Sequence, residues 1–144
     1  MGSIWSQTCS IGRRPPLRGH LKTQAAVVGA GMAGVLTAYA LQQAGLSVVV
    51  LEADRIAGGQ TQNTTAKITS QHGLIYSRLI QSFGEETARR YAKANQDAVR
   101  AYQDLIDVQG ISCDWEERCA YLYGPDVTVL QEEAEAARRL GLPA

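Results

Sequence analysis

The sequence has few of the residues that build disulfide frameworks or metal sites. Its 144 residues include three cysteines and two histidines. Cys9, Cys113 and Cys119 are an odd number and show no CxxC or CxH spacing, so the pattern indicates neither a disulfide framework nor a metal centre. We therefore expect free thiols and no bound metal.

Long hydrophobic runs and an excess of charge of one sign are also absent. No apolar stretch approaches the roughly 20 residues that span a bilayer. The N-terminus, with Arg13, Arg14 and Arg18, has no apolar segment of signal-peptide length. The 14 basic side chains balance the 14 acidic ones, and nothing in this balance favours nucleic acid. These absences predict a soluble, cytoplasmic protein without a membrane-spanning segment or a nucleic-acid partner.

A strand–helix–strand pattern lies near the N-terminus. Ala26–Gly29 and Val48–Glu52 are short apolar runs that fit buried parallel strands. Between them, Met32–Ala44 has apolar residues at helical spacing, and Gly45 follows where a left-handed C-terminal residue is expected. A strand, helix and strand in this order predict a parallel pair with a right-handed crossover.

The remaining segments predict other elements. Residues 1–24 contain prolines and glycines without hydrophobic periodicity, and so predict an extended lead. After a polar loop over 54–73, the apolar face of Glu85–Val108 predicts a long amphipathic helix. ISCDW (111–115) and CAYLYG (119–124) predict two short strands, and Val127–Leu140 predicts a final helix.

Three glycines lie in VVGAGMAG, between the first strand and the helix. Gly29 permits a tight turn, Gly31 has no side chain where a pyrophosphate approaches the backbone, and Gly34 lets the helix pack closely on the strand. The helix beginning at Met32 directs unpaired N–H groups and the positive end of its dipole to the same place. Glu52 follows at close to the roughly 20-residue spacing of an acidic residue that binds ribose hydroxyls. Together these features predict a dinucleotide site; the alternative is an ordinary turn with a solvated glutamate.

A paired glycine, Gly58 and Gly59, lies a few residues beyond Glu52. It allows a loop to return over the cofactor, which favours a flavin over a nicotinamide nucleotide. The stretch VVGAGMAGVLTAYALQQAGLSVVVLEADRIAGGQTQNTTAK resembles the start of flavin-dependent oxidoreductases of the glycine oxidase and D-amino-acid oxidase family. SIW, NTTAKITSQHGLIY and AYLYG are similar to one branch of it, whose members often add a C-terminal Rieske domain. The spaced Cys and His pairs of a Rieske centre are absent from this sequence.

The resemblance implies FAD as the cofactor and a set of contacts. The glycine turn lies on the pyrophosphate in such proteins, the acidic residue binds the adenosine ribose, and the loop beyond it approaches the pyrophosphate and the flavin. The implied FAD-binding residues are Gly29, Ala30, Gly31, Met32, Ala33, Gly34, Glu52, Ala53, Asp54, Gly59, Gln60, Thr61, Thr65, Ala66 and Lys67. An alternative for Thr61, Thr64 and Thr65 is that they bond their own backbone in turns. His72 is implied near the reactive edge of the flavin, with a structural role as its alternative and no other catalytic candidate.

The expected architecture is an α/β fold with a Rossmann-like βαβ FAD-binding unit of parallel strands, followed by a long helix and the start of a substrate-domain sheet. We expect an extended lead over 1–24, the FAD unit and flavin loop over 25–84, and a helical segment opening a truncated substrate domain over 85–144. The implied function is hydride transfer from the C–N carbon of a small amine or amino acid to FAD. The alternatives are an NAD-binding domain and a noncatalytic nucleotide-binding or interaction module. We expect the 144 residues to lack parts of both domains and to be too short for catalysis alone.

Overall fold

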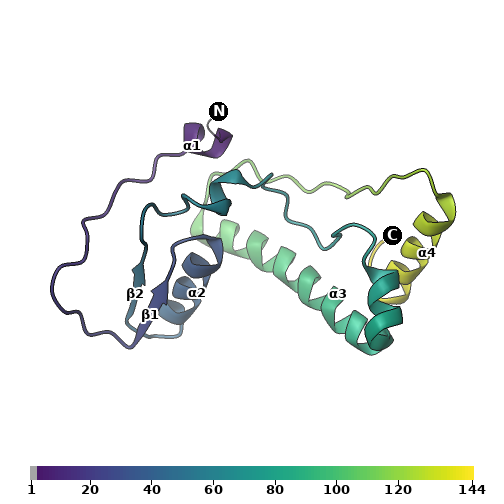
Figure 1. The fold of residues 1–144 in the computed structure, drawn as a ribbon, viewed down its shortest axis with the longest axis horizontal. Coiled ribbons are helices and arrows are strands. Elements are labelled where there is room, and N and C mark those ends of the chain that lie inside the picture. The colour runs from purple at the N-terminus through teal and green to yellow at the C-terminus, as the bar shows by residue number, and fades with distance from the viewer. Residues whose placement is uncertain (1–2) are drawn as a thin grey trace. The chain divides into compact units, whose positions relative to one another are not determined.

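The structure is a computed structural model that describes residues 3–144 and falls into two compact units (Figure 1). The first unit ends at Ala66, and the second runs from Lys67 to Ala144. This boundary lies inside the polar loop. The functional division at residues 84 and 85 stays a prediction.

The first unit contains the predicted strand–helix–strand pattern. Strand β1 (Ala25–Val28) is followed by helix α2 (Met32–Gln43) and strand β2 (Val48–Leu51). The two strands pair in parallel, with Ala25 opposite Val48 and Val28 opposite Leu51. Gly45 has a φ of +84°, so the left-handed residue after the helix is also confirmed. The prediction of a parallel βαβ unit is correct.

The expectation that both strands are buried is wrong for this chain. Helix α2 covers the face of the sheet that carries Val27 and Val50. Residues of α2 and β2 line one apolar groove on this face, and Val27 lies beside Gly34 of the helix. Side chains alternate between the two faces of a sheet, so Val28 lies on the opposite face. No helix covers that face within the described part of the first unit, and Val28 is 85% exposed.

Two short helices were not predicted from the sequence. Helix α1 (Ile4–Thr8) lies in the lead, which was expected to be extended throughout, and the 3-10 helix η1 (Gln60–Asn63) lies in the loop after β2. Ser3 begins α1 because its side chain accepts a hydrogen bond from the N–H of Trp5, as a serine cap does. Residues 9–24 form neither helix nor strand.

The second unit consists of two helices and their connections. Helix α3 (Tyr76–Gln109) contains the predicted helix and extends it toward the N-terminus past a kink at Gly84, where φ is 80° and ψ is 160°. Helix α4 (Val127–Arg139) confirms the final predicted helix, and Asp126 caps it. No helix within residues 3–144 combines the length and the apolar character needed to cross a bilayer.

The predicted strands at 111–115 and 119–124 are wrong, because the structure forms no strand in either segment. An isolated two-stranded hairpin is marginally stable unless a third strand or a helix packs on its apolar face. Tyr121 and Tyr123 are 83% and 96% exposed, so no such surface receives them in the described part of the chain. The only sheet within residues 3–144 is the β1–β2 pair.

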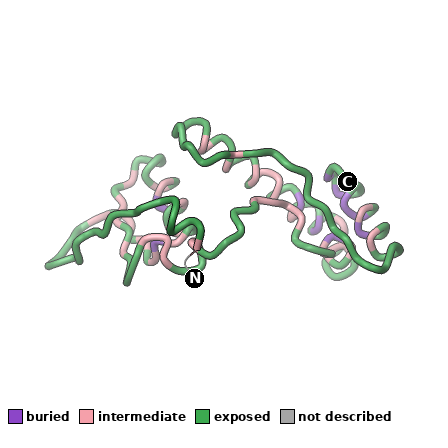
Figure 2. The backbone as a smooth tube through the Cα atoms, turned by 90° about the horizontal axis from the view of Figure 1, so that it is seen from above, coloured by how far each residue is buried: buried purple, intermediate pink, exposed green. Residues whose placement is uncertain are grey.

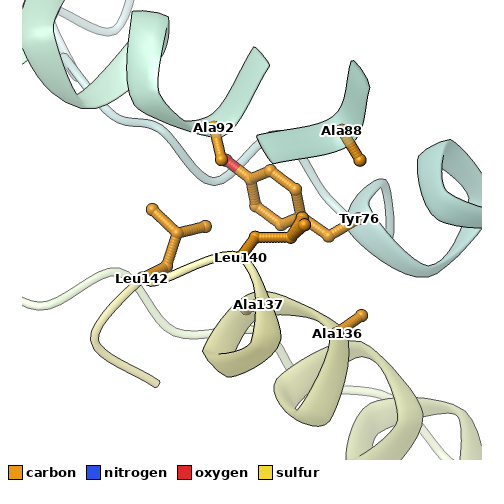
Figure 3. Close-up of a cluster of buried hydrophobic side chains, with 7 residues drawn as sticks. All are labelled: Tyr76, Ala88, Ala92, Ala136, Ala137, Leu140 and Leu142. Atoms are coloured by element: carbon orange, nitrogen blue, oxygen red, sulfur yellow. The ribbon is translucent and has the colours of Figure 1, made fainter. Parts of the chain in front are cut away.

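The core of the second unit lies where α3 and α4 meet (Figure 2). Tyr76 is fully buried, and small side chains let the two helices approach it closely (Figure 3). The ring of Tyr91 packs edge-on against that of Tyr76, with 6.4 Å between the ring centres. The buried cluster consists of Tyr76, Ala88, Ala92, Ala136, Ala137, Leu140 and Leu142.

A buried carboxylate joins α4 to the start of α3. Glu133 is only 3% exposed. Its carboxylate accepts hydrogen bonds from the N–H groups of Ile75, Tyr76 and Ser77 at 2.8 to 2.9 Å, and from the side-chain amide of Gln71 at 3.3 Å. The first amides of a helix have no partner within it and attract negative charge. Glu133 therefore caps α3 from the neighbouring helix.

We predict that Glu133→Ala destabilises the second unit by about 2–4 kcal/mol, because it leaves several backbone donors without an acceptor in a buried place. Glu133→Gln retains one carbonyl acceptor and should cost less. Urea denaturation followed by circular dichroism measures the change. Glu132→Ala, at an exposed position of the same helix, is the control, and equal midpoints for the two alanine variants would contradict the prediction.

Candidate dinucleotide site

The turn after β1 begins at Gly29. Its N–H donates to the carbonyl of Leu51 at 2.7 Å, which continues the pairing of the two strands by one residue. Its φ of +99° is in the region that favours glycine. The next residue, Ala30, is 2% exposed. Gly29 therefore makes the tight turn that the sequence predicted.

Gly34 is required by packing. A Cβ atom at this position would lie 1.9 Å from the carbonyl oxygen of Gly29 and 3.0 Å from its carbonyl carbon. Both atoms belong to the backbone of the turn and cannot move aside without breaking it. The absence of a side chain at Gly34 thus lets α2 lie against the end of β1, as predicted.

Gly31 is different, because neither conformation nor packing requires it to be glycine. Its φ of −76° and ψ of −179° are extended angles that any residue adopts. A Cβ atom here would have only one protein atom near it, the Oγ1 of Thr61 at 3.4 Å, which is ordinary contact. The space that a side chain would fill lies at the N-terminus of α2. That space is available to a ligand.

The N-terminus of α2 offers hydrogen-bond donors at the same place. The N–H of Met32 donates to the Oγ1 of Thr61 at 2.9 Å, and the first backbone bond of the helix runs from Val35 to Gly31 at 3.0 Å. Ala33 and Gly34 lie between them, where first-turn amides have no partner inside the helix. With the positive end of the helix dipole, they favour an anion.

The carboxylate of Glu52 holds the turn from the end of β2. One oxygen accepts the N–H of Ala30 at 2.7 Å, and the other accepts the N–H of Asp54 at 3.0 Å. These bonds, the one from Ala30 foremost, lower the pKa of Glu52. A carboxylate has about four acceptor positions, so an exposed Glu52 that accepts two backbone bonds can accept more.

The loop after β2 returns to the glycine turn, as the paired glycine predicted. The N–H of Ala57 donates to the carbonyl of Ala30 at 2.9 Å, and the hydroxyl of Thr61 caps Met32. Gly58 is required locally, since a Cβ there would lie 2.9 Å from that of Arg55. Gly59 precedes η1 as its N-cap, and a Cβ atom added to it would meet no protein atom within 4 Å, so packing does not explain this glycine.

The other candidates lie along this loop with fewer contacts. Thr64 is a turn residue, because its hydroxyl donates to the carbonyl of Thr61 and accepts the N–H of Ala66, each at 3.3 Å. The hydroxyl of Thr61 instead accepts a hydrogen bond from the N–H of Met32 in α2. The remaining candidates of the first unit are exposed residues after β2 and around η1, namely Ala53, Asp54, Gln60, Thr65 and Ala66. Lys67 is exposed and is the first residue of the second unit.

His72 also belongs to the second unit. Its Nε2 lies 3.2 Å from the Oδ1 of Asn95 on α3, and the ring is exposed. The neighbouring Ser70 is held on the same helix by Gln96, whose side chain donates to the serine hydroxyl at 2.8 Å. These contacts fasten the loop to α3, and the place of His72 near the flavin stays a prediction.

Sequence reasoning missed one residue by which the return loop contacts the glycine turn and two residues of the lead that contact the loop. Ala57 adopts a φ of 57° and bonds the turn, but an alanine carries no sequence pattern that indicates this. Ser3 and Trp5 bond the carbonyls of Gln62 and Thr64. A serine before IWSQT is a helix-cap pattern that could have revealed α1, though not the contact.

We predict that acid loosens the glycine turn through Glu52. Because the pKa of Glu52 is lowered from 4.5, its ionised form stabilises the turn above pH 4.5, and this stabilisation is lost as the pH falls through the lower value in the folded chain. The exchange rate and chemical shift of the Ala30 amide, followed by NMR during acidification, measure the loss. Glu52→Gln should remove this change at the Ala30 amide, and Asp54→Asn should keep it. A change that persists in Glu52→Gln would refute the assignment of the titration to Glu52.

Comparison with known proteins gives relatives over nearly the whole chain. "Putative Rieske 2Fe-2S iron-sulfur protein YhfW" of Bacillus subtilis is 36% identical over 97% of the chain. The gamma-glutamylputrescine oxidoreductase of Escherichia coli is 28% identical over 80% of it. The tRNA 5-methylaminomethyl-2-thiouridine biosynthesis bifunctional protein MnmC of Ectopseudomonas mendocina is 33% identical over 91%.

The chain spans 28%, 28% and 21% of the lengths of these three relatives. No solved structure matches it. Residues 24–144 match the family described as FAD dependent oxidoreductase, a range that contains β1, the glycine turn, Glu52 and the return loop. The cofactor of this family is FAD. Since the match covers most of the sequence, the chain belongs to the FAD dependent oxidoreductase family.

Proposed function

We propose that the first unit holds the ADP half of FAD in an enzyme that oxidises a carbon–nitrogen bond of a small amine or amino acid. The observation that carries the cofactor site is Gly31. It is a glycine that neither its backbone angles nor its neighbours require, at a helix N-terminus suited to a phosphate. The family membership supports FAD as the occupant of this place.

The residues present fit the cofactor in chemical character. The N–H groups of Ala33 and Gly34 and the dipole of α2 bind the pyrophosphate, and Gly31 leaves room for it beside the backbone. The carboxylate of Glu52 accepts hydrogen bonds from the ribose hydroxyls while it continues to hold Ala30. Because backbone bonds lower the pKa of Glu52, the acceptor stays ionised at neutral pH.

The loop after β2 shapes the same site from the other side. Ala57 fastens it to Ala30, and Thr61 lies at the first amide of α2. We assign Ala53 and Asp54 to the border of the adenine. Gly59, Gln60, Thr65 and Ala66 are assigned to the side toward the flavin, and Lys67, the first residue of the second unit, is assigned to FAD from the family resemblance alone. Each of these assigned residues is exposed and so accessible to a ligand.

FAD, when bound, accepts the hydride and so supplies the electron chemistry, while the protein supplies binding and orientation. The named relatives support a substrate with a carbon–nitrogen bond. One is called a gamma-glutamylputrescine oxidoreductase, and another is named for the biosynthesis of 5-methylaminomethyl-2-thiouridine in tRNA. We propose the substrate class for the whole protein, because the chain spans 28% or less of these relatives.

The test compares two glycines of the same turn. Gly31→Ala should leave the fold intact, since its backbone angles and surroundings accept a methyl group, yet weaken FAD binding at least about tenfold, because the methyl occupies the phosphate space. Gly34→Ala should instead disrupt the packing of α2 on β1, because the added methyl group would clash with the backbone of Gly29.

Thermal melts followed by circular dichroism measure folding, and quenching of flavin fluorescence in a titration of the full chain measures affinity for FAD. NAD in place of FAD is the control for cofactor type and should bind far more weakly. A folded Gly31→Ala variant that binds FAD as tightly as the parent chain would show that Gly31 is not at the pyrophosphate.

A further inference from the structure

The lead segment returns to the loop that closes the dinucleotide site. The indole N–H of Trp5 donates to the carbonyl of Thr64 at 2.8 Å, and the hydroxyl of Ser3 donates to the carbonyl of Gln62. In each pair the donor lies 59 residues before its acceptor. Both groups belong to the first unit. Residues 3–8, called the strap from here on, thus contact the backbone of η1 and the residue after it.

The strap is held by hydrogen bonds rather than by an apolar core. No residue of α1 is buried, and Ile4 is 60% exposed. The carbonyls that the strap binds lie at the end of a short 3-10 helix, where carbonyl groups have no partner within the helix. Ser3 also accepts the N–H of Trp5 at 3.3 Å, so the same residue begins α1 and fastens it to the loop.

The contacted segment carries Thr61, the residue that caps α2. The hydroxyl of Thr61 accepts the N–H of Met32, its carbonyl accepts the hydroxyl of Thr64, and it precedes Gln62 directly. A continuous set of hydrogen bonds therefore runs from Trp5 through Thr64 and Thr61 to the N-terminus of α2. The hydroxyl at the proposed pyrophosphate site is therefore connected to the strap by hydrogen bonds.

We propose that the strap positions the cofactor loop, with Trp5 as a positioning residue for FAD. The identity of the ligand rests on the proposed function, whereas the contact between the strap and the loop does not. By holding η1 against α2 before the cofactor arrives, the strap reduces the conformational freedom that the loop loses on binding, and preorganisation of this kind increases affinity. Residues 9–24, which form no helix or strand and are exposed apart from the half-buried Thr23, connect the strap to β1 without fixing it.

The test removes the indole donor while keeping an aromatic ring. Trp5→Phe should speed the hydrogen exchange of the Met32 amide about 2- to 10-fold in the chain without FAD, the effect of one ordinary hydrogen bond. It should raise the Kd for FAD by a similar factor. Ser3→Ala, which removes the other donor, should change both quantities in the same direction.

Thr8→Val is the matched control, because the hydroxyl of Thr8 donates to the carbonyl of Ile4 inside α1 and not to the loop. It should leave both quantities unchanged. An unchanged exchange rate of the Met32 amide in both Trp5→Phe and Ser3→Ala would overturn the claim that the strap holds the loop. Faster exchange with unchanged FAD affinity would overturn the claim that Trp5 positions FAD. If the parent chain binds no FAD, the proposed function fails, while the exchange data still decide whether the strap holds the loop.

Discussion

The hydrogen bond from the Ala30 amide to the carboxylate of Glu52 joins the two halves of the βαβ unit at the place where its function is proposed. Strand pairing ends with the N–H of Gly29 on the carbonyl of Leu51, and one residue later on each strand the Glu52 carboxylate continues the connection at 2.7 Å. The carbonyl of Ala30 then receives the return loop through Ala57. The turn, the acidic residue and the loop consequently form one bonded arrangement, in which each part depends on the position of Ala30.

Glu52 and Glu133 both accept hydrogen bonds from backbone amides, and their surroundings give them different roles. Glu133 is buried and accepts four donors at the start of α3, which matches the acceptor capacity of a carboxylate, so it is structural. Glu52 is exposed and accepts hydrogen bonds from two backbone amides, those of Ala30 and Asp54. Its remaining capacity faces solvent, where a hydroxyl-bearing ligand can use it. Exposure, unused acceptor positions and the contact with the glycine turn together distinguish Glu52 from Glu133.

Sequence patterns predicted the elements whose residues carry a local physical reason. β1 and β2 follow from short apolar runs, and α2 and the part of α3 after Gly84 follow from apolar residues at helical spacing. Gly29 and Gly34 follow from the demands of a tight turn and close packing. The part of α3 before Gly84 was not predicted, because the kink at Gly84 interrupts the helical spacing of apolar residues. The predicted strands near Tyr121 and Tyr123 do not form, because nothing in the described chain packs on these side chains. Contacts made by Ala57 and Trp5 depend on tertiary structure, which a single sequence does not reveal.

The position of the pyrophosphate is tested by mapping the backbone amides that respond when FAD is added to the full chain, using NMR chemical shifts. We predict that the largest changes fall on Met32, Ala33 and Gly34, with smaller changes at Ala30 and along residues 57–61. These amides lie at the N-terminus of α2 and on the loop bonded to it. Saturable changes that leave the turn unaffected and fall elsewhere would contradict the assignment of the turn to the pyrophosphate.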